Sequence, residues 1–597
     1  MEKAPVIIVG AGLAGSLMAI YLAKKGLLVE IFESRPDMRA TEISAGRSIN
    51  LALSDRGILA LEEVGVIDKV MAEAVKMPGR MLHAKDGALK FAPYGKDSSQ
   101  YINSISRGGL NQLLMTEAES YQNVSIHFNQ KCVDVNFETS SIIVEDYETQ
   151  QQRTVQGCTI IGGDGANSAV RNAMENQMDG YQSSVDWLEH GYKELSIPPM
   201  ENATFALEKN ALHIWPRGNY MLIALPNADG SFTCTLFFPH TGPVSFESLD
   251  TPQKVQAFFE EQFGDAVPYL VNLQEEFANN PVGKLGTLKC YPWIHSEKAV
   301  LIGDAAHAVV PFYGQGMNAS FEDCRILNAC IDEHGVGNWS AAYNAYQQLR
   351  KVNGDAIGDL AVENFYEMRD HVANPIFRKK RTLEHLLENT YEDYHSKYSL
   401  VTFQPQIPYS IAKNLGNQQD ALLMKLCKEV TQIEDLDLAT VYAQLKALKD
   451  ELPLQKKFMK AAIDEAKKGR DAGGIPIGSV LVKNGEIIGA GHNQRVQQND
   501  PMAHAEIDCL KQAGRVGSYH DMVLYSTLMP CYLCAGAVVQ FGIKKVIVGE
   551  NTTFSGAEQF MKEHGVEVIN LNNQECIDLM TTFIHQHPKL WNEDIGE

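Results

Sequence analysis

The chain has 597 residues, more than one hydrophobic core usually serves, so at least two domains are expected. Apolar residues make up 45% and charged residues 21%, as in soluble globular proteins, which excludes a mainly disordered chain. The formal net charge of −22, with no compensating basic patch, argues against binding to a nucleic-acid backbone and favours small-molecule substrates.

The 11 cysteines are odd in number and thinly spread, and the first residues, MEKAPVIIVGAG, enter a strand pattern without a signal peptide. We therefore expect a protein of the reducing cytoplasm. No stretch approaches the roughly 18 uninterrupted apolar residues of a membrane span, so no membrane partner is expected.

The first predicted elements are a strand, a glycine-rich turn, a helix and a second strand over residues 4–33. This βαβ arrangement is typical of a dinucleotide-binding domain. Two later strand-like segments, CTIIGGDG and KAVLIGDAA, each end on a glycine–acid pair, which indicates that they return to the same sheet. Between them, residues 190–240 alternate in the manner of antiparallel strands, so an inserted sheet domain is expected.

Helical patterns dominate from about residue 340 to 450 and end at Leu452-Pro453, where we expect a domain boundary. A new helix is expected at QKKFMKAAIDEAKKGR, followed by a glycine-punctuated hairpin in GGIPIGSVLVKNGEIIGAG. Helix and strand then alternate, so the remaining residues predict a separate, compact α/β domain.

Gly10, Gly12 and Gly15 form a G-x-G-x-x-G motif between the first strand and its helix, and Glu33 ends the next strand. The glycines let a pyrophosphate approach the backbone and the helix N-terminus, while the carboxylate can accept a hydrogen bond from an adenosine ribose. Alone, the motif also fits a purely structural glycine turn.

Two further segments, IIGGDGANSAVR and VLIGDAAHAVVPFYGQGMN, resemble the second and third signatures of FAD-dependent aromatic hydroxylases. The resemblance implies FAD-binding segments near 5–35, 100–172 and 295–325. In it, Asp304 holds a hydroxyl of the ribityl side, and backbone amides of the glycine-rich run face the isoalloxazine. The other positions assigned to the cofactor in this way are Arg107, Asp164, Gly303, Gly314, Gly316, Met317 and Asn318. Because the chain has a single dinucleotide motif, NADPH is expected to bind transiently.

Residues 5–430 resemble the kynurenine 3-monooxygenases in particular, in segments such as GRSINLALSDRG, PYGKDSSQYINSISR, HGYKELSIPP and ALHIWPRGNYMLIALPN. The resemblance implies hydroxylation of L-kynurenine to 3-hydroxykynurenine with NADPH and O₂, through a flavin hydroperoxide. It places Arg80 and Tyr94 on the substrate carboxylate, which suits a guanidinium fork, with Asn364 and Tyr398 assisting. Without the resemblance, we would interpret Arg80 as an ordinary surface arginine. Eukaryotic members carry a C-terminal membrane anchor that the second domain replaces here, so an unanchored enzyme is expected.

The segments MAHAEID and TLMPCYLC supply His504, Glu506, Cys531 and Cys534 in the H-x-E…P-C-x-x-C pattern of zinc deaminases. Three protein ligands, His504, Cys531 and Cys534, leave a fourth tetrahedral position for a catalytic water. Glu506 is then a proton shuttle and not a ligand. We expect His504 and Glu506 at a helix start, where both can face the metal. A structural zinc with an incidental glutamate is the alternative.

Residues 455–597 resemble the fungal type of cytosine deaminase in GGIPIG, GHNQR, LYSTLMPCYLC and the tail LWNEDIGE. The resemblance places Asn493 and Asp594 on the pyrimidine edge and Phe554 and Trp591 over the ring. The family usually has glycine where this chain has Ala505, a residue common in tRNA adenosine deaminases.

The expected fold is α/β in two domains. Residues 1–450 are expected to combine an FAD-binding Rossmann-like domain, an antiparallel substrate sheet near 185–285 and a helical part at 340–450. Residues 454–597 are expected to form a three-layer α/β/α deaminase domain. We expect a bifunctional enzyme that uses FAD, NADPH and Zn²⁺, acts on L-kynurenine, O₂ and cytosine, binds no nucleic acid and forms a homodimer through its deaminase domain. Two alternatives stay open, a deaminase of tRNA adenosine or another nucleobase and an inactive zinc-stabilised dimerisation module.

Overall fold

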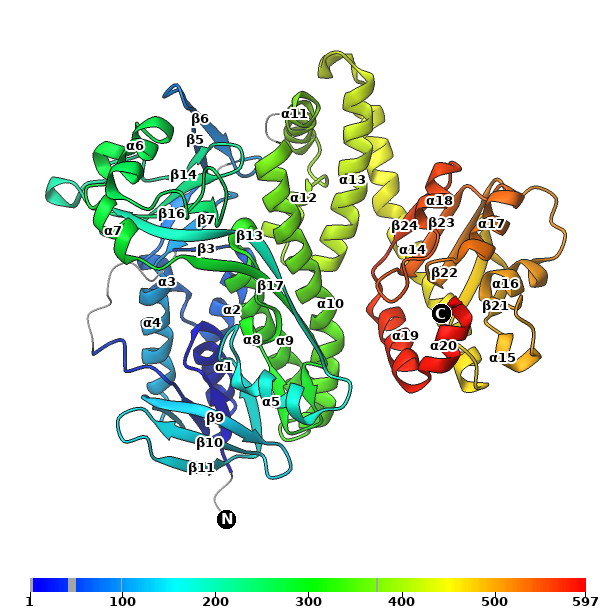
Figure 1. Cartoon of the computed structure of the whole chain (residues 1–597), viewed down its shortest axis with the longest axis horizontal. Coiled ribbons are helices and arrows are strands. Elements are labelled where there is room, and N and C mark those ends of the chain that lie inside the picture. Colours follow the sequence, from blue (N-terminus) through cyan, green and yellow to red (C-terminus); the bar gives the residue numbers. More distant parts are fainter. Residues whose placement is uncertain (1–3, 41–49, 98, 372–373, 597) are drawn as a thin grey trace. The chain divides into compact units, whose positions relative to one another are not determined.

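A computed structural model describes residues 4–40, 50–97, 99–371 and 374–596. The chain divides into two compact units, Met1–Asp437 and Leu438–Glu597 (Figure 1). Residues 46–49, the start of the GRSINLALSDRG segment, lie outside the described residues. Within the described residues, every helix is too short or too polar to span a bilayer.

The first unit is built on a six-stranded sheet in the order β18-β19-β12-β1-β2-β8. Its strands are β1 (Val6–Val9), β2 (Val29–Phe32), β8 (Val124–His127), β12 (Thr159–Gly162), β18 (Ile294–His295) and β19 (Ala299–Leu301). All pairs are parallel except β18 with β19. The expectation that the two distant segments return to the sheet of residues 4–33 is therefore confirmed. Helix α1 (Leu13–Lys24) follows β1 and is almost entirely buried.

A second sheet of seven strands, in the order β17-β13-β16-β15-β14-β5-β6, forms the inserted domain. The strands are β5 (Gly79–His83), β6 (Leu89–Pro93), β13 (Gln182–Ile197), β14 (Ala211–Pro216), β15 (Met221–Pro226), β16 (Phe232–Pro239) and β17 (Gly283–Tyr291). All pairs are antiparallel except β5 with β14. Trp215 and Phe232 pack with Phe259 of α6 (Pro252–Gln262) and Phe277 of α7 (Leu273–Asn279) in one apolar cluster. This cluster fixes the sheet whose strand β5 carries Arg80.

Smaller sheets and helices complete the first unit. The strands are β3 (Leu51–Leu53), β4 (Val75–Met77), β7 (Ile102–Ile105), β9 (Gln130–Asn136), β10 (Ser141–Asp146) and β11 (Gln152–Gln156). The helices that matter below are α2 (Asp55–Val64), α4 (Arg107–Glu119), α8 (Asp304–His307), α9 (Gly316–His334), α10 (Trp339–Tyr366), α11 (Pro375–Thr390), α12 (Lys397–Thr402) and α13 (Tyr409–Glu429). The helical part expected from residue 340 onward is present.

The expected break at Pro453 is wrong, because α14 (Leu438–Asp471) continues through this residue as one helix. Proline removes one backbone donor, but packing on the following turns outweighs that cost. Phe458, Met459 and Ile463 of α14 are buried against the sheet of the second unit. The division between the units lies before the helix, between Asp437 and Leu438.

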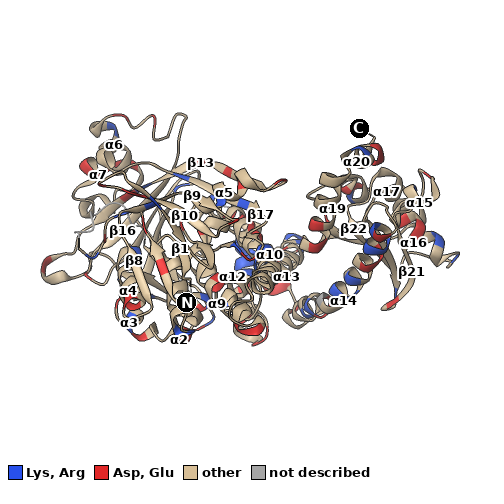
Figure 2. Ribbon diagram, turned by 90° about the horizontal axis from the view of Figure 1, so that it is seen from below, with Lys and Arg blue, Asp and Glu red and all other residues tan. Residues whose placement is uncertain are grey.

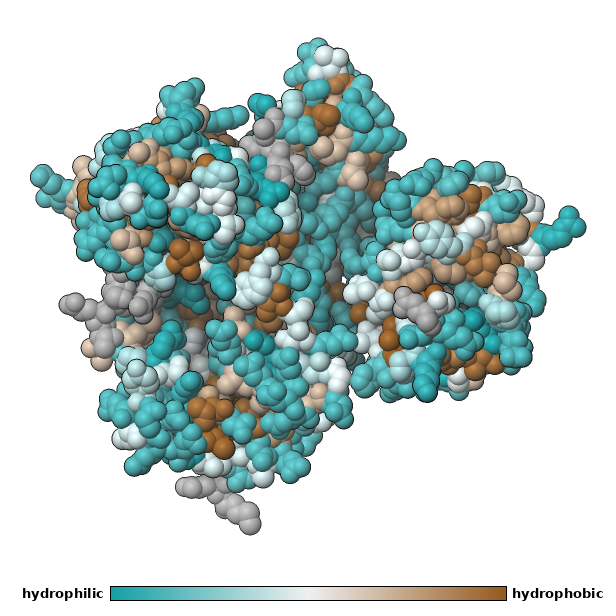
Figure 3. All heavy atoms as spheres, viewed as in Figure 1, coloured by the Kyte–Doolittle hydropathy of each residue, from teal (hydrophilic) through white to brown (hydrophobic). Residues whose placement is uncertain are grey.

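The second unit is a three-layer α/β/α structure, as the sequence predicts. Its five-stranded sheet has the order β21-β20-β22-β23-β24, with β20 (Gly478–Lys483), β21 (Glu486–His492), β22 (Met522–Leu528), β23 (Lys545–Glu550) and β24 (Glu567–Asn570). Helices α14 and α19 (Gln574–Gln586) share one apolar cluster with the sheet. Helices α16 (Ala505–Ala513), α17 (Tyr532–Phe541) and α18 (Glu558–Glu563) share the other. The visible surfaces of both units are mainly hydrophilic (Figure 3).

Candidate active sites

The glycine turn after β1 brings backbone into contact with backbone. Gly10 has a φ of +95°, and a Cβ on Gly15 would lie 2.0 Å from the Gly10 carbonyl oxygen. A Cβ on Gly10 would lie 2.8 Å from the Gly163 carbonyl oxygen, which follows β12. Helix α1 opens at Gly12 with no side-chain cap. Its first amides are therefore available to an anion such as a pyrophosphate.

Glu33 stands at the end of β2 beside this turn. Its carboxylate accepts hydrogen bonds from the Ala11 amide at 2.9 Å and from Arg35 Nε at 2.8 Å. Burial raises the pKa of Glu33, but the hydrogen bonds and charge of Arg35 and the two backbone amides outweigh it, so the pKa lies below its usual value. The group is an ionised acceptor at neutral pH, as a ribose hydroxyl would require.

Two acidic residues follow β12 and β19 at the same edge of the sheet. Asp164 Oδ2 accepts from the Ala169 amide at 2.6 Å, while Oδ1 is buried and has no hydrogen-bond partner. Burial raises the pKa of Asp164. Gly303, with a φ of +58°, precedes Asp304, which is partly exposed at the start of α8. A buried carboxylate oxygen without a partner is typical of a ligand position.

The glycine-rich run forms the start of α9. Gly314 has a φ of +68°, and Gln315 is the N-cap without a side-chain cap, so the amides of Gly316, Met317 and Asn318 have no partner within the helix. The Asn318 side chain is already engaged, since Nδ2 donates to Ala52 and Gly314 carbonyls and Oδ1 accepts from the Ser54 amide. Asn318 can therefore serve a flavin through its backbone only.

Helix α4 packs against the glycine turn through Asn111, which the sequence reasoning missed. Asn111 Nδ2 donates to the Ala11 carbonyl at 3.1 Å, and its buried Oδ1 has no partner. Arg107 is exposed as the first residue of α4, where the helix dipole disfavours a cation. Helix α4 thus places Arg107 on the side of the sheet that carries the glycine turn.

Arg80 lies beside two tyrosine rings that stack on each other. Its guanidinium carbon is 4.8 Å from the Tyr94 ring centroid and 4.9 Å from that of Tyr398, and the two rings are stacked with centroids 5.6 Å apart. The Tyr94 hydroxyl is buried without a hydrogen-bond partner. The structure therefore brings three of the four expected carboxylate-binding residues into one cluster.

The fourth residue, Asn364, is connected to this cluster through the backbone of residues 312 and 313. Its Nδ2 donates to the Phe312 carbonyl at 2.7 Å. Tyr313, which follows Phe312 and precedes Gly314, stacks on Tyr398 with ring centroids 5.7 Å apart. Sequence reasoning missed Tyr313, although it stands inside the PFYGQGMN segment. Tyr313 therefore joins the Arg80 cluster to the glycine-rich run at residues 314–318, where the sequence predicts contact with the flavin.

In the second unit, His504, Cys531 and Cys534 meet with their ligand atoms all within 4.8 Å of one another. His504 is the N-cap of α16 and Cys531 the N-cap of α17, so both helices begin at the metal position. The expectation that His504 and Glu506 lie at a helix start is confirmed. A hydrogen bond from Cys534 and the nearby His504 lower the pKa of Cys531 to about 4, against the effect of burial. One imidazole nitrogen and two cysteine sulfurs in this arrangement fit a zinc ion with one open position.

Glu506 is buried beside these three residues. Its Oε1 accepts a hydrogen bond from Ser526 Oγ at 2.7 Å. Burial and the neighbouring Cys531 raise the pKa of Glu506. A carboxyl whose pKa is raised is suited to carrying a proton during the reaction. Ser526, in the middle of β22, was not identified from the sequence because its role depends on the pairing of distant segments.

The residues expected around a pyrimidine lie next to the zinc ligands. Asn493 is fully buried with its Nδ2 unpartnered, and the rings of Phe554 and Trp591 meet edge to face at 5.8 Å. Asp594, in α20 (Pro588–Ile595), forms an ion pair with Arg495 Nη1. Arg495 also donates its backbone amide to Asn493 Oδ1. This arginine, which sequence reasoning missed, links the two residues expected on the pyrimidine edge.

Comparison with family models matches an FAD binding domain to residues 3–230 and 290–351. The cytidine and deoxycytidylate deaminase zinc-binding region matches residues 453–550. FAD and zinc are therefore the cofactors of the two units, and the residues described above fit both.

Among curated proteins, the chain is 48% identical to a kynurenine 3-monooxygenase of Myxococcus xanthus over 73% of this chain and 94% of that protein. A kynurenine 3-monooxygenase of Dictyostelium discoideum is 44% identical over 73% and 96% of the two chains. Solved structures of similar fold include tetrameric 2-methyl-3-hydroxypyridine-5-carboxylic acid oxygenase, with a TM-score of 0.50 and 20% identity over 64% of this chain and 96% of that one. PqsL of Pseudomonas aeruginosa in complex with 2-aminobenzoylacetate gives 0.51 and 17% over 62% and 97%.

The crowded glycine turn yields a test of the FAD site. A Gly15→Ala side chain meets backbone and not a flexible side chain, so the turn must move and we expect FAD affinity to fall at least about tenfold, or 1.4 kcal/mol. Flavin absorbance per chain and FAD titration measure this. Gly109→Ala, whose Cβ makes only ordinary contacts at 3.6 Å, is the control and should bind FAD normally. Equal FAD binding by both variants would contradict the assignment of the turn.

Proposed function

The chain belongs to the kynurenine 3-monooxygenase family over 73% of its length, and from this premise we propose that its first unit hydroxylates L-kynurenine to 3-hydroxykynurenine with NADPH and O₂. One observation carries the proposal. Arg80 lies against the stacked rings of Tyr94 and Tyr398, and Tyr313 connects this cluster to the glycine-rich run that begins at Gly314. A carboxylate bound there puts the rest of a small aromatic amino acid next to the flavin loop.

The protein's part in this reaction is to bind, orient and exclude water. The guanidinium of Arg80 pairs with the substrate carboxylate, and the buried Tyr94 hydroxyl, which has no partner of its own, donates to it. Burial lowers the pKa of Arg80, but Tyr398 and Tyr94 offset this and the net shift is upward, so the cation persists. Bound FAD supplies the oxygen-transferring chemistry. The stacked tyrosines fix the direction in which the substrate ring points from its carboxylate.

We propose further that the second unit deaminates free cytosine to uracil. His504, Cys531 and Cys534 would hold the zinc, which supplies an activated water when bound. Glu506, whose Oε1 accepts a hydrogen bond from Ser526, would take up a proton from the attacking nucleophile and donate it to the leaving amine. Asn493 and Asp594 offer a donor and an acceptor to the edge of the base, and Phe554 and Trp591 enclose its ring.

The surface charge favours a free base over a tRNA substrate. From residue 451 onward the chain has 14 Lys and Arg and 18 Asp and Glu, a balance of 14 − 18 = −4. In the view of Figure 2, the helices of this unit carry both Lys or Arg and Asp or Glu. An RNA-binding surface would be basic. Trp591 is 5% exposed and packs on Phe554, so in the proposed site it would have to move to admit a base attached to a polynucleotide.

The alternatives that remain are a tRNA adenosine deaminase and a zinc-stabilised dimerisation module. Ala505, in place of the usual glycine, supports the first. A dimerisation module has no use for Glu506, a buried acid that lies outside the group of three candidate metal ligands and accepts a hydrogen bond from Ser526. Burying such a carboxyl costs stability, which catalysis explains and dimerisation does not.

For the hydroxylase, Arg80→Ala should raise the KM for L-kynurenine by roughly 10- to 150-fold, the equivalent of losing a charge-assisted pair of about 1.5–3 kcal/mol. FAD content should not change, because Arg80 lies in β5 and not at the glycine turn. NADPH oxidation and 3-hydroxykynurenine formation by the full chain measure both. Lys90→Ala, on the exposed strand β6, is the control for changes in the sheet. An unchanged KM in Arg80→Ala would remove this residue from the substrate site.

For the deaminase, Glu506→Ala should keep about one zinc per chain but lose roughly 10²- to 10⁴-fold in ammonia release, because the ligands remain and the proton carrier does not. Metal analysis and an ammonia assay on one sample separate the two effects. Glu567→Ala, a change of the same kind at an exposed position of β24, should have no effect. Zinc loss in the Glu506 variant would instead make Glu506 part of the metal shell.

The identity of the base follows from comparing ammonia release from cytosine, cytidine and a tRNA anticodon stem-loop under the same conditions. We expect cytosine to be preferred, and Asp594→Ala to lower its turnover by at least about a hundredfold without releasing zinc, because unpaired polar groups in a closed site discriminate strongly. Efficient inosine formation in the RNA, with cytosine inert, would establish the tRNA alternative.

A further inference from the structure

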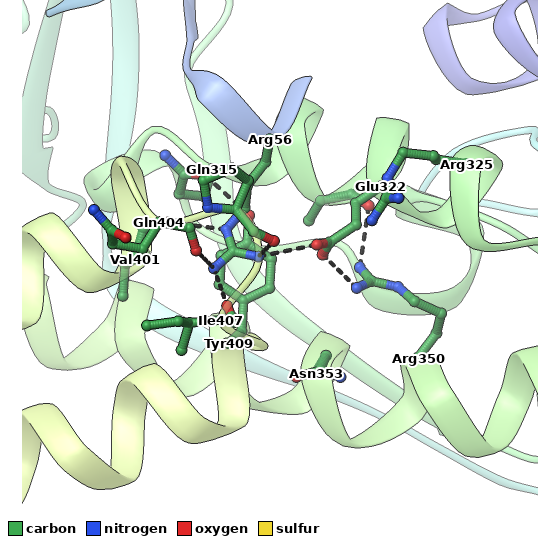
Figure 4. Close-up of polar contacts among 12 residues, drawn as sticks. Arg56, Gln315, Glu322, Arg325, Arg350, Asn353, Val401, Gln404, Ile407 and Tyr409 are labelled. Carbon is green, nitrogen blue, oxygen red and sulfur yellow. Dashed lines mark hydrogen bonds and ion pairs between the residues drawn. The ribbon is translucent and has the colours of Figure 1, made fainter. Parts of the chain in front are cut away.

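Arg56, in the first turn of α2, is a fully buried arginine whose donors are used almost entirely by one distant segment. Its side chain is 0% exposed. Nε donates to the Val401 carbonyl at 3.0 Å, and the terminal nitrogens donate to the carbonyls of Pro405, Gln404 and Ile407. Figure 4 shows Val401, Gln404 and Ile407 around the guanidinium. Arg56 therefore holds the whole turn between α12 and α13.

This turn is the end of the helix that carries Tyr398. Val401 lies in the last turn of α12, three residues after Tyr398, and its carbonyl is one that the helix itself leaves unpaired. A buried cation satisfies these carbonyls and suits the negative end of the helix dipole. The position of Tyr398 against Arg80 thus depends on where Arg56 holds the end of α12.

One series of contacts connects Arg56 to the start of α9. The guanidinium carbon lies 4.0 Å from the ring centroid of Tyr409, the first residue of α13. The Tyr409 hydroxyl donates to Gln315 Oε1 at 2.9 Å. Gln315 is the N-cap of α9, whose free amides make up the flavin-facing run.

A second series of contacts consists of buried charged residues (Figure 4). Arg56 Nη1 donates to Glu322 Oε1 at 2.9 Å, and Glu322 Oε2 accepts from Arg350. Arg350 Nε donates to Asp323 Oδ1 at 2.7 Å, and Asp323 Oδ2 accepts from the Gly303 amide at 2.9 Å. This series of contacts therefore ends at Gly303, which precedes Asp304 in the second of the two segments expected to face the flavin.

We propose that Arg56 is a positioning residue that couples occupation of the Arg80–Tyr94–Tyr398 cluster to the two flavin-facing segments at Gly303 and Gln315. The proposal rests on the proposed hydroxylase function only for the identity of the substrate. A substrate carboxylate that draws Tyr398 toward Arg80 moves α12, and Arg56 passes this displacement to the amides that face the flavin. Lysine cannot replace it, because one ammonium group cannot reach four carbonyls and a carboxylate in fixed directions.

The first test compares Arg56→Lys with the wild-type full chain, both loaded with FAD. We expect Arg56→Lys to bind FAD and oxidise NADPH, but to form about tenfold less hydroxylated product per NADPH, with hydrogen peroxide making up the difference. The change in flavin absorbance on adding L-kynurenine should also be lost. Arg325→Lys is the matched control, because Arg325 is an arginine of α9 whose side chain is 25% exposed and whose ion pair with Glu63 is long, at 3.7 Å. If Arg56→Lys formed as much hydroxylated product per NADPH as the wild-type protein, the proposal would be overturned.

The second test does not depend on the substrate. Hydrogen exchange of the apoprotein and the FAD-loaded chain should show that FAD protects residues 397–408 as well as 311–320. In Arg56→Lys the protection of 397–408 should be lost while that of 311–320 remains. Tyr409→Phe, which removes only one hydroxyl, should weaken the same protection even if the Arg56 variant folds poorly. Persistent protection of 397–408 in these variants overturns the proposal. If L-kynurenine changes neither the flavin absorbance nor NADPH oxidation of the wild-type protein, the proposed hydroxylase function is refuted. The hydrogen-exchange result still tests the role of Arg56 in that case.

Discussion

Asp323 is a fully buried carboxylate on which three parts of the first unit converge. It accepts from the Gly303 amide, from His307 Nε2 at 2.6 Å and from Arg350 Nε. Burial raises its pKa, but His307 and Arg350 more than compensate, so the pKa lies below its usual value. A charge removed from water at a cost of several kcal/mol is tolerated only when every partner is in place. The loop after β19 is therefore specified by the partners of Asp323 and not by local propensity.

The same constraint supports the backbone around the expected flavin site. Gly303 and Gly314 have positive φ values, which glycine adopts readily. Helices α9 and α10 supply Asp323 and Arg350, and Asp323 holds the loop by accepting the Gly303 amide. The amides of Gly316, Met317 and Asn318 have no partner within α9. The loop is therefore held by a buried ion-pair network, and these helix amides are available to a cofactor.

The sequence predicts those parts of both sites that depend on local geometry. Gly10 and Gly15 are needed because a side chain would strike backbone, and Cys531 and Cys534 belong to one helix start. Resemblance adds Arg80 and Tyr398, which no spacing rule connects. Tyr313, Arg495 and Ser526 were missed because each acts across segments far apart in the chain. The break expected at Pro453 failed for the same reason, since packing of later turns on the sheet outweighs a local helix breaker.

The two sites differ in the chemistry of their buried polar groups. The Arg80 cluster sets one cation beside two stacked aromatic rings, and the buried Tyr94 hydroxyl there has no hydrogen-bond partner. The His504 cluster combines three candidate metal ligands with a buried acid whose pKa is raised. Each set needs its own arrangement of surrounding side chains, because buried polar groups without partners cost stability. Separate units with separate cores meet both requirements.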